Sequence, residues 1–275
     1  MKKVIKTIGL IFCFAILMAG CHKEDIEEQE NEGEEPMTIA VLEKQLEEKA
    51  KTIDVSEVKD YRLVEEDLSK PPYSDGFTNK PIHQIPLAQQ PDWLSYVAYT
   101  YGQAIICRAD INGEYIYNIN RTLSSSYGYE FDYNGIYLGP SSSNSGLNWE
   151  LVCVTGTEVI EDYDAKKEML HHTENPLVGR WYVEPVDDYL TYWVFSSSGI
   201  GESYNLVNGK KSNSLYFLYS AKVVTLSDGR EWIALKMAFE GQKLTHNVFY
   251  SPNKSGDELT SVLSDHYKLR KVADK

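Results

Sequence analysis

The 275-residue sequence lacks the short motifs by which most enzyme classes are recognised. It contains no glycine-rich phosphate loop, no Cys-x-x-Cys, no His-Glu-x-x-His, no Gly-x-Ser-x-Gly and no calcium-loop pattern. The adjacent histidines His171 and His172 lie at the charged end of a predicted helix and are interpreted as a solvated pair, not as a metal site. Asp187 and Asp188 are also adjacent and would point to opposite faces of a strand, so a turn role is preferred. We therefore expect no metal, no cofactor and no enzymatic activity.

The sequence also has little positive charge and no long apolar run. Its formal net charge is -14, which makes nucleic acid an unsuitable partner. The apolar run at residues 8–19 is well short of the roughly 20 residues that a membrane-spanning helix needs. Because three lysines precede this run and small residues end it, residues 1–20 are predicted to be a secretory signal peptide.

The end of this segment, Leu17-Met18-Ala19-Gly20-Cys21, resembles the lipobox of bacterial lipoproteins. That resemblance implies cleavage before Cys21 and a diacylglyceryl group on its thiol, with acyl chains such as palmitate. Several acyl chains on one residue suffice for stable anchoring, so the expected partner is a membrane, held through lipid on Cys21. The alternative is an ordinary signal peptide followed by an unrelated cysteine.

Residues 21–36 are predicted to be an acidic tether. Beyond Cys21 they contain eight acidic residues, one lysine and a single aliphatic side chain, a composition that cannot form a core. The run Lys23, Glu24 and Asp25 resembles the acidic export signal of surface lipoproteins of Bacteroidota, which implies an outer-membrane lipoprotein exposed at the cell surface. The alternative is a solvated spacer on a lipoprotein that faces the periplasm.

Two segments separate this tether from the expected domains. Residues 37–70 are predicted to be a charged helical segment, because apolar residues recur at helical spacing over residues 38–53. This helix either packs on its own domain or binds a partner. Residues 71–91 hold five of the ten prolines and are predicted to be an extended linker.

Residues 92–171 are predicted to be a small α+β domain. Short alternating runs are divided by Asn-Gly turns at residues 112–113 and 134–135, which indicates hairpins, and residues 158–171 are expected to be a helix. Cys107 and Cys153 both fall in predicted strands, so a disulfide is plausible in an oxidising compartment. Two buried free thiols are the alternative, and a catalytic thiol is disfavoured because no histidine lies near either cysteine in the sequence.

Residues 177–275 are predicted to form an antiparallel meander of short strands that closes into a barrel or folds as a sandwich. Its opening residues 177–181, Leu-Val-Gly-Arg-Trp, resemble the Gly-x-Trp strand of lipocalin-like domains. The resemblance implies that Gly179 and Trp181 close one end of a barrel, with a basic residue of the last strand above the indole. Arg270 is the predicted basic residue, and Lys268 on the same strand face is the alternative. The fold class is therefore mainly β, with a small lipocalin-like barrel preceded by an α+β domain and an N-terminal helix.

Strand alternation gives an approximate set of residues that point into the barrel. The bulky ones are candidates to line a ligand site, and they are Trp193, Tyr204, Phe217, Met237 and Phe239. An eight-stranded barrel can hold one small ligand or be filled by its own side chains. Both outcomes remain open because so many of these residues are aromatic.

Three functions are compatible with these features. The first is a tethered, non-enzymatic binding module for a small apolar ligand, a glycan or a protein. The second is an interaction or inhibitory subunit of an envelope complex, which would bind through edge strands and exposed aromatic residues. The third is a hydrolase whose site is assembled from distant residues. An empty apolar barrel would favour the first, a filled barrel with an exposed aromatic patch the second, and clustered carboxylates or histidines with shifted pKa values in a cleft the third.

Overall fold

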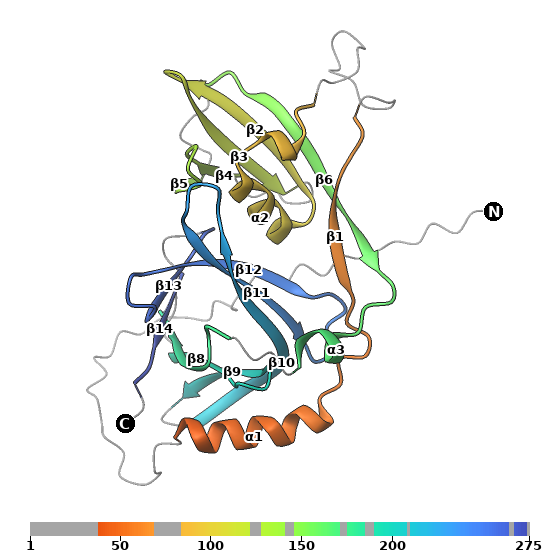
Figure 1. Ribbon diagram of the computed structural model, residues 1–275, viewed down its shortest axis with the longest axis vertical. Coiled ribbons are helices and arrows are strands. Elements are labelled where there is room, and N and C mark those ends of the chain that lie inside the picture. Colours follow the sequence, from red (N-terminus) through yellow and green to blue (C-terminus); the bar gives the residue numbers. More distant parts are fainter. Residues whose placement is uncertain are drawn as a thin grey trace, which may run out of the picture. The chain divides into compact units, whose positions relative to one another are not determined.

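Eight consecutive strands close into an antiparallel barrel in the computed structural model (Figure 1). The structure describes residues 38–68, 84–121, 128–140, 146–170, 175–184, 190–207, 210–263 and 267–273. The barrel strands are β7 (Gly179–Val183), β8 (Leu190–Phe195), β9 (Ile200–Val207), β10 (Lys210–Thr225), β11 (Glu231–Phe239), β12 (His246–Pro252), β13 (Glu258–Ser261) and β14 (Lys268–Lys271). Each pairs with the next, and β14 pairs with β7, so the predicted meander and barrel are confirmed.

Glycine turns set the path of this meander. Gly229 lies between β10 and β11, and Gly241 lies between β11 and β12, with φ angles of 84° and 79°. Residues with a side chain seldom adopt this left-handed conformation, so glycine allows the chain to reverse tightly here. The residues between the turns alternate between lumen and exterior, as strand geometry requires.

The remaining strands form a six-stranded antiparallel sheet in the order β1-β6-β2-β3-β4-β5. Its members are β1 (Asp60–Glu65), β2 (Ala104–Ile111), β3 (Glu114–Arg121), β4 (Tyr129–Phe131), β5 (Tyr137–Pro140) and β6 (Glu150–Ile160). The predicted helical segment 37–70 therefore needs correction, because β1 lies within it and pairs with β6 over its whole length. The predicted helix at 158–171 is also shorter than expected, since residues 158–160 end β6 and α3 covers only Ala165–Met169.

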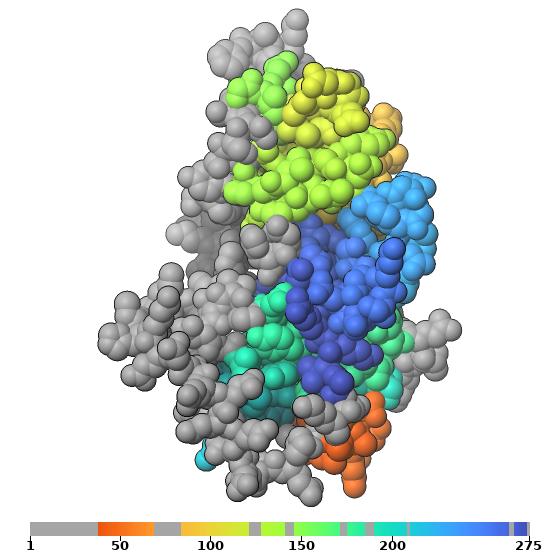
Figure 2. All heavy atoms as spheres, turned by 90° about the vertical axis from the view of Figure 1, so that its left-hand side faces the viewer, coloured from red at the N-terminus to blue at the C-terminus, as the bar shows by residue number. Residues whose placement is uncertain are grey.

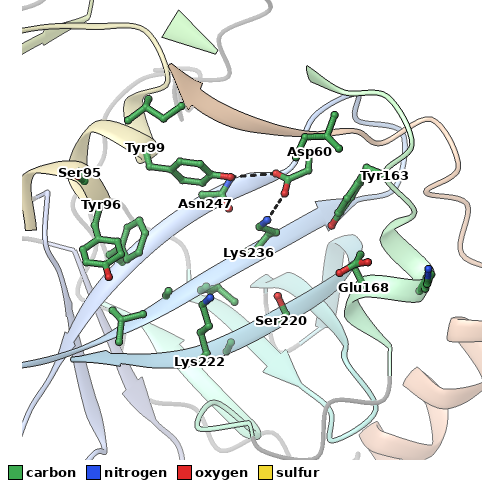
Figure 3. Close-up of a pocket in the computed structure, with 18 of the residues that line it drawn as sticks. Asp60, Ser95, Tyr96, Tyr99, Tyr163, Glu168, Ser220, Lys222, Lys236 and Asn247 are labelled. Atoms are coloured by element: carbon green, nitrogen blue, oxygen red, sulfur yellow. Dashed lines mark hydrogen bonds and ion pairs between the residues drawn. The ribbon is translucent and has the colours of Figure 1, made fainter. Parts of the chain in front are cut away.

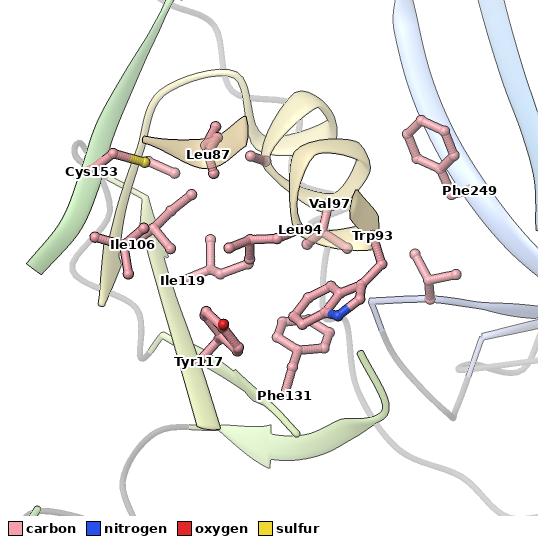
Figure 4. Packing of buried hydrophobic residues seen from close by; sticks show 14 of the residues in the cluster. Leu87, Trp93, Leu94, Val97, Ile106, Tyr117, Ile119, Phe131, Cys153 and Phe249 are labelled. Atoms are coloured by element: carbon pink, nitrogen blue, oxygen red, sulfur yellow. The ribbon is translucent and has the colours of Figure 1, made fainter. Parts of the chain in front are cut away.

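Helix α2 (Asp92–Tyr101) lies against the sheet and carries the centre of its core (Figure 4). Trp93, Leu94 and Val97 pack on Ile119 and Phe131 of the sheet. The same core continues into the barrel through Leu226, Trp232, Phe249 and Val262. Within residues 36–275, which form one compact unit, the sheet and the barrel thus share buried apolar surface.

Polar contacts also connect the barrel turn at residues 227–230 to α2 and to the loop between β4 and β5. The Asp92 carboxylate accepts hydrogen bonds from the Ser227 backbone N–H at 2.7 Å and from its hydroxyl at 3.2 Å. Arg230, in the same barrel turn, donates to the carbonyl of Asn134. Figure 2 shows a face on which green strands of the sheet and blue strands of the barrel meet.

Helix α1 (Ile39–Thr52) packs on the outside of the barrel. Its buried residues Leu42 and Leu46 contact a cluster that includes Val194 and Leu218 of the barrel, and Lys49 forms an ion pair of 2.9 Å with Glu240. Of the two alternatives for this helix, packing on its own chain is the one observed. A short 3-10 helix, η1 (Leu87–Gln89), precedes α2. No helix in the described part of the chain is long and apolar enough to cross a membrane.

Candidate functional site

The barrel lumen is filled by its own side chains. Trp193, Phe217 and Met237, which were predicted to line a ligand site, are buried in one cluster with Phe195, and Phe239 packs against it. The rings of Phe217 and Phe239 are 4.9 Å apart, and those of Trp193 and Phe217 are 6.0 Å apart. These residues therefore form a core, which is one of the two outcomes left open by the sequence.

Tyr204 does not point into the lumen. It pairs with Tyr192, whose ring stacks on it at 5.6 Å, and it is buried beneath α1 together with Leu206. The lumen-facing neighbour on β9 is Ser203, which pairs with Trp193. Because α1 covers the outside of this strand, the large apolar residues Ile200, Tyr204 and Leu206 lie on the outer face, and alternation alone assigned Tyr204 to the lumen.

Gly179 and Trp181 lie on β7, the first strand of the barrel. The Trp181 indole is buried and donates a hydrogen bond of 2.7 Å to the carbonyl of Leu177. Gly179 has a φ of 129°, and a Cβ at this position would lie 3.1 Å from the Lys271 side chain. A residue with a side chain would therefore be disfavoured by the backbone conformation, whereas the flexible end of Lys271 could move aside.

The basic residue over Trp181 is Lys271, and the prediction of Arg270 is corrected. The Lys271 ammonium lies 5.6 Å from the centre of the Trp181 ring, and the two residues are cross-strand partners. Arg270 faces outward and forms ion pairs with Glu184 and Glu258. Lys268, the alternative, also pairs with Glu258. The prediction was one residue out of register on the last strand.

Cys107 and Cys153 are free thiols, so the structure contains no disulfide between them. Cys153 pairs with the buried Ile106, whereas Cys107 pairs with Leu151 after a register shift, so the two thiols point to opposite faces of the sheet. Burial raises the pKa of Cys153 to about 12 and also raises that of Cys107. Both thiols therefore remain protonated at neutral pH.

Several predicted features lie outside the described residues. The predicted segments are the signal peptide, the acidic tether and residues 71–83 of the linker. The predicted site residues are the lipid attachment at Cys21, the export signal at Lys23, Glu24 and Asp25, the His171-His172 pair and the Asp187-Asp188 pair. Among the described residues, no group of three or more histidine, cysteine or acidic side chains is placed to hold a metal ion.

A cleft of about 1140 Å³ lies outside the barrel, between its wall and the sheet (Figure 3). Helix α2 contributes Ser95, Tyr96 and Tyr99 to one side. Barrel strands β10 to β12 contribute the opposite side, and β1 and the segment leading into α3 close one end. The volume is that of a pocket for a small ligand or a short oligomer.

The register of the barrel strands arranges the cleft residues in two rows. One row runs across β10, β11 and β12 as Ser220, Lys236 and Asn247. The next row runs in the same direction as Lys222, Ala234 and Phe249. Polar and charged groups thus lie beside an aromatic ring on one surface, with the small Ala234 between them.

Asp60 joins the sheet to the barrel at the back of this cleft. Asp60 is only 4% exposed, and its carboxylate forms an ion pair with Lys236. It also accepts a hydrogen bond of 2.7 Å from the Thr245 hydroxyl. The Tyr99 hydroxyl donates to the Tyr61 carbonyl at 2.7 Å and lies 3.4 Å from the same carboxylate. A buried carboxylate with this many partners holds its neighbours in fixed positions.

The shifted pKa values in the cleft belong to tyrosines. Burial, followed by the negative charge of Asp60, raises the pKa of Tyr99 and of Tyr163 above the ordinary tyrosine value. Both therefore remain neutral hydroxyl groups at physiological pH. The Tyr163 ring lies 5.9 Å from the Lys236 ammonium, and its buried hydroxyl has no hydrogen-bond partner among the described residues.

This arrangement is suited to binding. Within the described residues, neither serine of the cleft, Ser95 nor Ser220, is hydrogen-bonded to a base that would activate it as a nucleophile. The buried Asp60 is occupied by Lys236 and Thr245, so it is a structural group. The cleft presents hydroxyl, amide, ammonium and aromatic groups along β10 to β12 and α2, and the carboxylates of Asp162 and Glu168 lie at the end formed by α3 and the segment before it.

No local pattern in the sequence indicates this cleft. One feature of the sequence could have pointed to it: Lys236 interrupts the apolar run of β11, which suggests that this position faces a polar partner or solvent. Asp60, its partner, lies 176 positions away in the sequence, so no local pattern joins them. No family model, no curated protein and no solved structure matches this chain.

Proposed function

We propose that the protein is a lipid-anchored, non-enzymatic binding module of the bacterial envelope that holds its ligand in the cleft outside the barrel. The observation that carries this proposal is the contrast between a filled lumen and an open, preformed cleft. A ligand inside the barrel would have to displace buried aromatic rings, whereas a ligand in the cleft would meet groups that already face open space.

The cleft is suited to binding because its walls are held in place before a ligand arrives. Besides the Asp60–Lys236 ion pair, the Lys59 carbonyl accepts a hydrogen bond of 2.9 Å from the Thr245 N–H, and Lys59 N–H donates to the Lys243 carbonyl at 2.9 Å. At the other end, Asp92 of α2 binds Ser227 of the barrel. Walls that are fixed in advance reduce the entropy lost on binding.

The ligand site is tested by filling the cleft and measuring the ligand that copurifies with the protein. Ser220→Trp places a bulky ring on the cleft side of β10, and Ser214→Trp makes the same change at an exposed position of the same strand. Native mass spectrometry of protein purified from its own cells is expected to detect a bound ligand in the wild type and in Ser214→Trp. The ligand should be missing from Ser220→Trp, and equal occupancy in the two variants would reject the cleft as the binding site.

Membrane attachment has its own test. Because the proposed anchor is lipid on Cys21, a Cys21→Ser protein should appear in the soluble fraction while its circular dichroism spectrum and melting temperature stay close to those of the wild type. A Cys21→Ser protein that still sediments with membranes would reject the lipid anchor. Replacing Lys23, Glu24 and Asp25 by alanine should protect the protein from protease added to intact cells, if these residues direct it to the cell surface.

A second candidate function is that of an interaction subunit in an envelope complex. It is favoured by Tyr133, Ile136 and Leu138, three apolar side chains that are all more than half exposed near the edge strand β5. Exposed apolar groups that lie close together often mark a protein contact. A Leu138→Glu variant should lose such a partner in a pull-down from envelope extracts and should keep the ligand of the cleft.

A further inference from the structure

The cleft contains a lysine without an ionic partner. Lys236 is held by Asp60, whereas Lys222 forms no ion pair with any residue that the structure describes. Figure 3 shows the Lys222 side chain rising from β10 into the space below Tyr96. In the register, Lys222 is opposite Ala234 and therefore diagonal to Lys236, so two ammonium groups occupy neighbouring positions on one surface. An anionic group bound here would pair with Lys222, because Lys236 is already paired with Asp60.

An aromatic pair lies across from this lysine, in which Phe249 is buried and Tyr96 is partly exposed. Phe249 occupies the same row as Lys222, two strands away, and the Tyr96 ring lies 5.2 Å from the Phe249 ring. Ala234 lies between Lys222 and Phe249 and presents only a methyl group. Because the side chain of Ala234 is small, a ligand that contacts Lys222 can also reach the exposed part of the Tyr96 ring.

The adjacent row supplies the polar groups. Ser220 and Asn247 flank Lys236, and Ser95 lies on the opposite side of the cleft. A purely apolar ligand would remove water from Lys222 and from these hydroxyl and amide groups without replacing the lost hydrogen bonds, which is unfavourable. A sugar ring can do both things that the cleft needs. Its hydroxyl groups replace the hydrogen bonds lost to water, and the C–H groups on its face pack against an aromatic ring.

We infer that the cleft binds an acidic saccharide, with its carboxylate on Lys222 and a sugar ring against Tyr96. This inference rests on the proposed function and adds the chemical class of the ligand. The charge is recognised locally, because the chain as a whole carries a net charge of -14 and would repel an anion from most of its surface. Binding should therefore depend on Lys222 itself and not on the net charge of the protein.

The test measures binding of defined saccharides to the full chain in a detergent without a sugar headgroup. The probes are trigalacturonic acid and sialyllactose, with the methyl ester of trigalacturonic acid as a neutral analogue and benzoate as an acid without hydroxyl groups. Isothermal titration calorimetry is expected to detect at least one acidic saccharide. The neutral ester should bind about tenfold more weakly or not at all, because it cannot form a charge-assisted hydrogen bond.

Two lysine variants show whether the carboxylate of the saccharide binds to a lysine of the cleft. Lys222→Met should weaken binding of the acidic saccharide about tenfold or more and should remove its salt dependence. Lys254→Met is the matched control, since Lys254 is an exposed lysine on a barrel turn that does not line the cleft, and it should bind as the wild type does.

Several outcomes would overturn the inference. These are no binding of either acidic saccharide, equal binding of the acid and its ester, binding of benzoate alone, and full affinity in Lys222→Met. If Ser220→Trp loses a copurified ligand that proves to be neutral, the proposed function stands and the acidic saccharide is rejected. If the copurified ligand persists in Ser220→Trp, the proposed function itself fails.

Discussion

Strands β10 to β12 present one face to the barrel lumen and the other to the cleft, and the two faces differ in kind. The lumen face carries Phe217, Tyr219, Leu235 and Tyr250, all of them buried against one another. The cleft face carries Ser220, Lys222, Lys236 and Asn247 beside open space. A barrel that is stabilised by a solid interior is free to use its exterior for recognition, provided that a second element covers that exterior. Here the sheet and α2 form that cover.

The largest effect is expected from damage to the lumen face. Trp181→Ala removes a buried indole of the barrel and should lower the free energy of unfolding by about 3 to 5 kcal/mol. Thermal and urea melts of the full chain measure the loss. Because Trp181 does not line the cleft, ligand affinity at a temperature where the variant is folded should be unchanged. A variant that melts like the wild type and binds poorly would instead place the ligand in the lumen.

A smaller loss of stability is expected at the boundary between the two faces. Lys236→Met leaves the buried Asp60 carboxylate without its ionic partner and should lower the free energy of unfolding by about 3 kcal/mol. The double variant Asp60→Asn with Lys236→Met removes both charges and should recover part of this loss. Urea unfolding of the two single variants and the double variant measures the coupling. If the effects of the two single changes simply add, Asp60 and Lys236 do not act as a pair.

The smallest effect concerns β14, where two neighbouring lysine and arginine residues can be compared. Lys271→Met removes the ammonium over Trp181 and should lower the free energy of unfolding by about 0.5 to 1 kcal/mol. Arg270→Met removes exposed ion pairs, so a change in melting temperature near the limit of detection is expected. A larger loss for Arg270→Met than for Lys271→Met would restore the assignment made from sequence alone.

The same contrast explains which features the sequence could predict. The barrel was predictable because its turns carry glycines such as Gly229 and Gly241 and its strands alternate. Alternation assigned Tyr204 to the wrong face. Helix α1 buries the outer face of β9, so that face carries apolar residues instead of the polar residues that usually mark an exterior. Alternation failed at Arg270 because β14 is a run of four residues with three basic side chains, in which only pairing with β7 sets the register.

The cleft could not be predicted from local sequence patterns, because long-range packing determines its walls. Helix α2 was missed because its residues, Trp93, Tyr96, Val97 and Tyr99 among them, are of types that favour strands, and their packing on the sheet overrides that preference. Strand β1 was hidden in a segment that opens with a helix, and it pairs with a strand almost a hundred residues later, as Arg62 and Glu158 illustrate at a separation of 96. Each wall of the cleft therefore depends on contacts between residues that are distant in the sequence.

Hydrogen exchange measured with the copurified ligand bound and removed tests most directly whether the ligand occupies the cleft. Bound ligand is expected to slow exchange in α2 and in residues 161–170, both of which line the cleft, and to leave β7, β8 and β14 unchanged. Slower exchange in β7, β8 and β14 without any change in α2 would place the ligand in the lumen and contradict the proposed site.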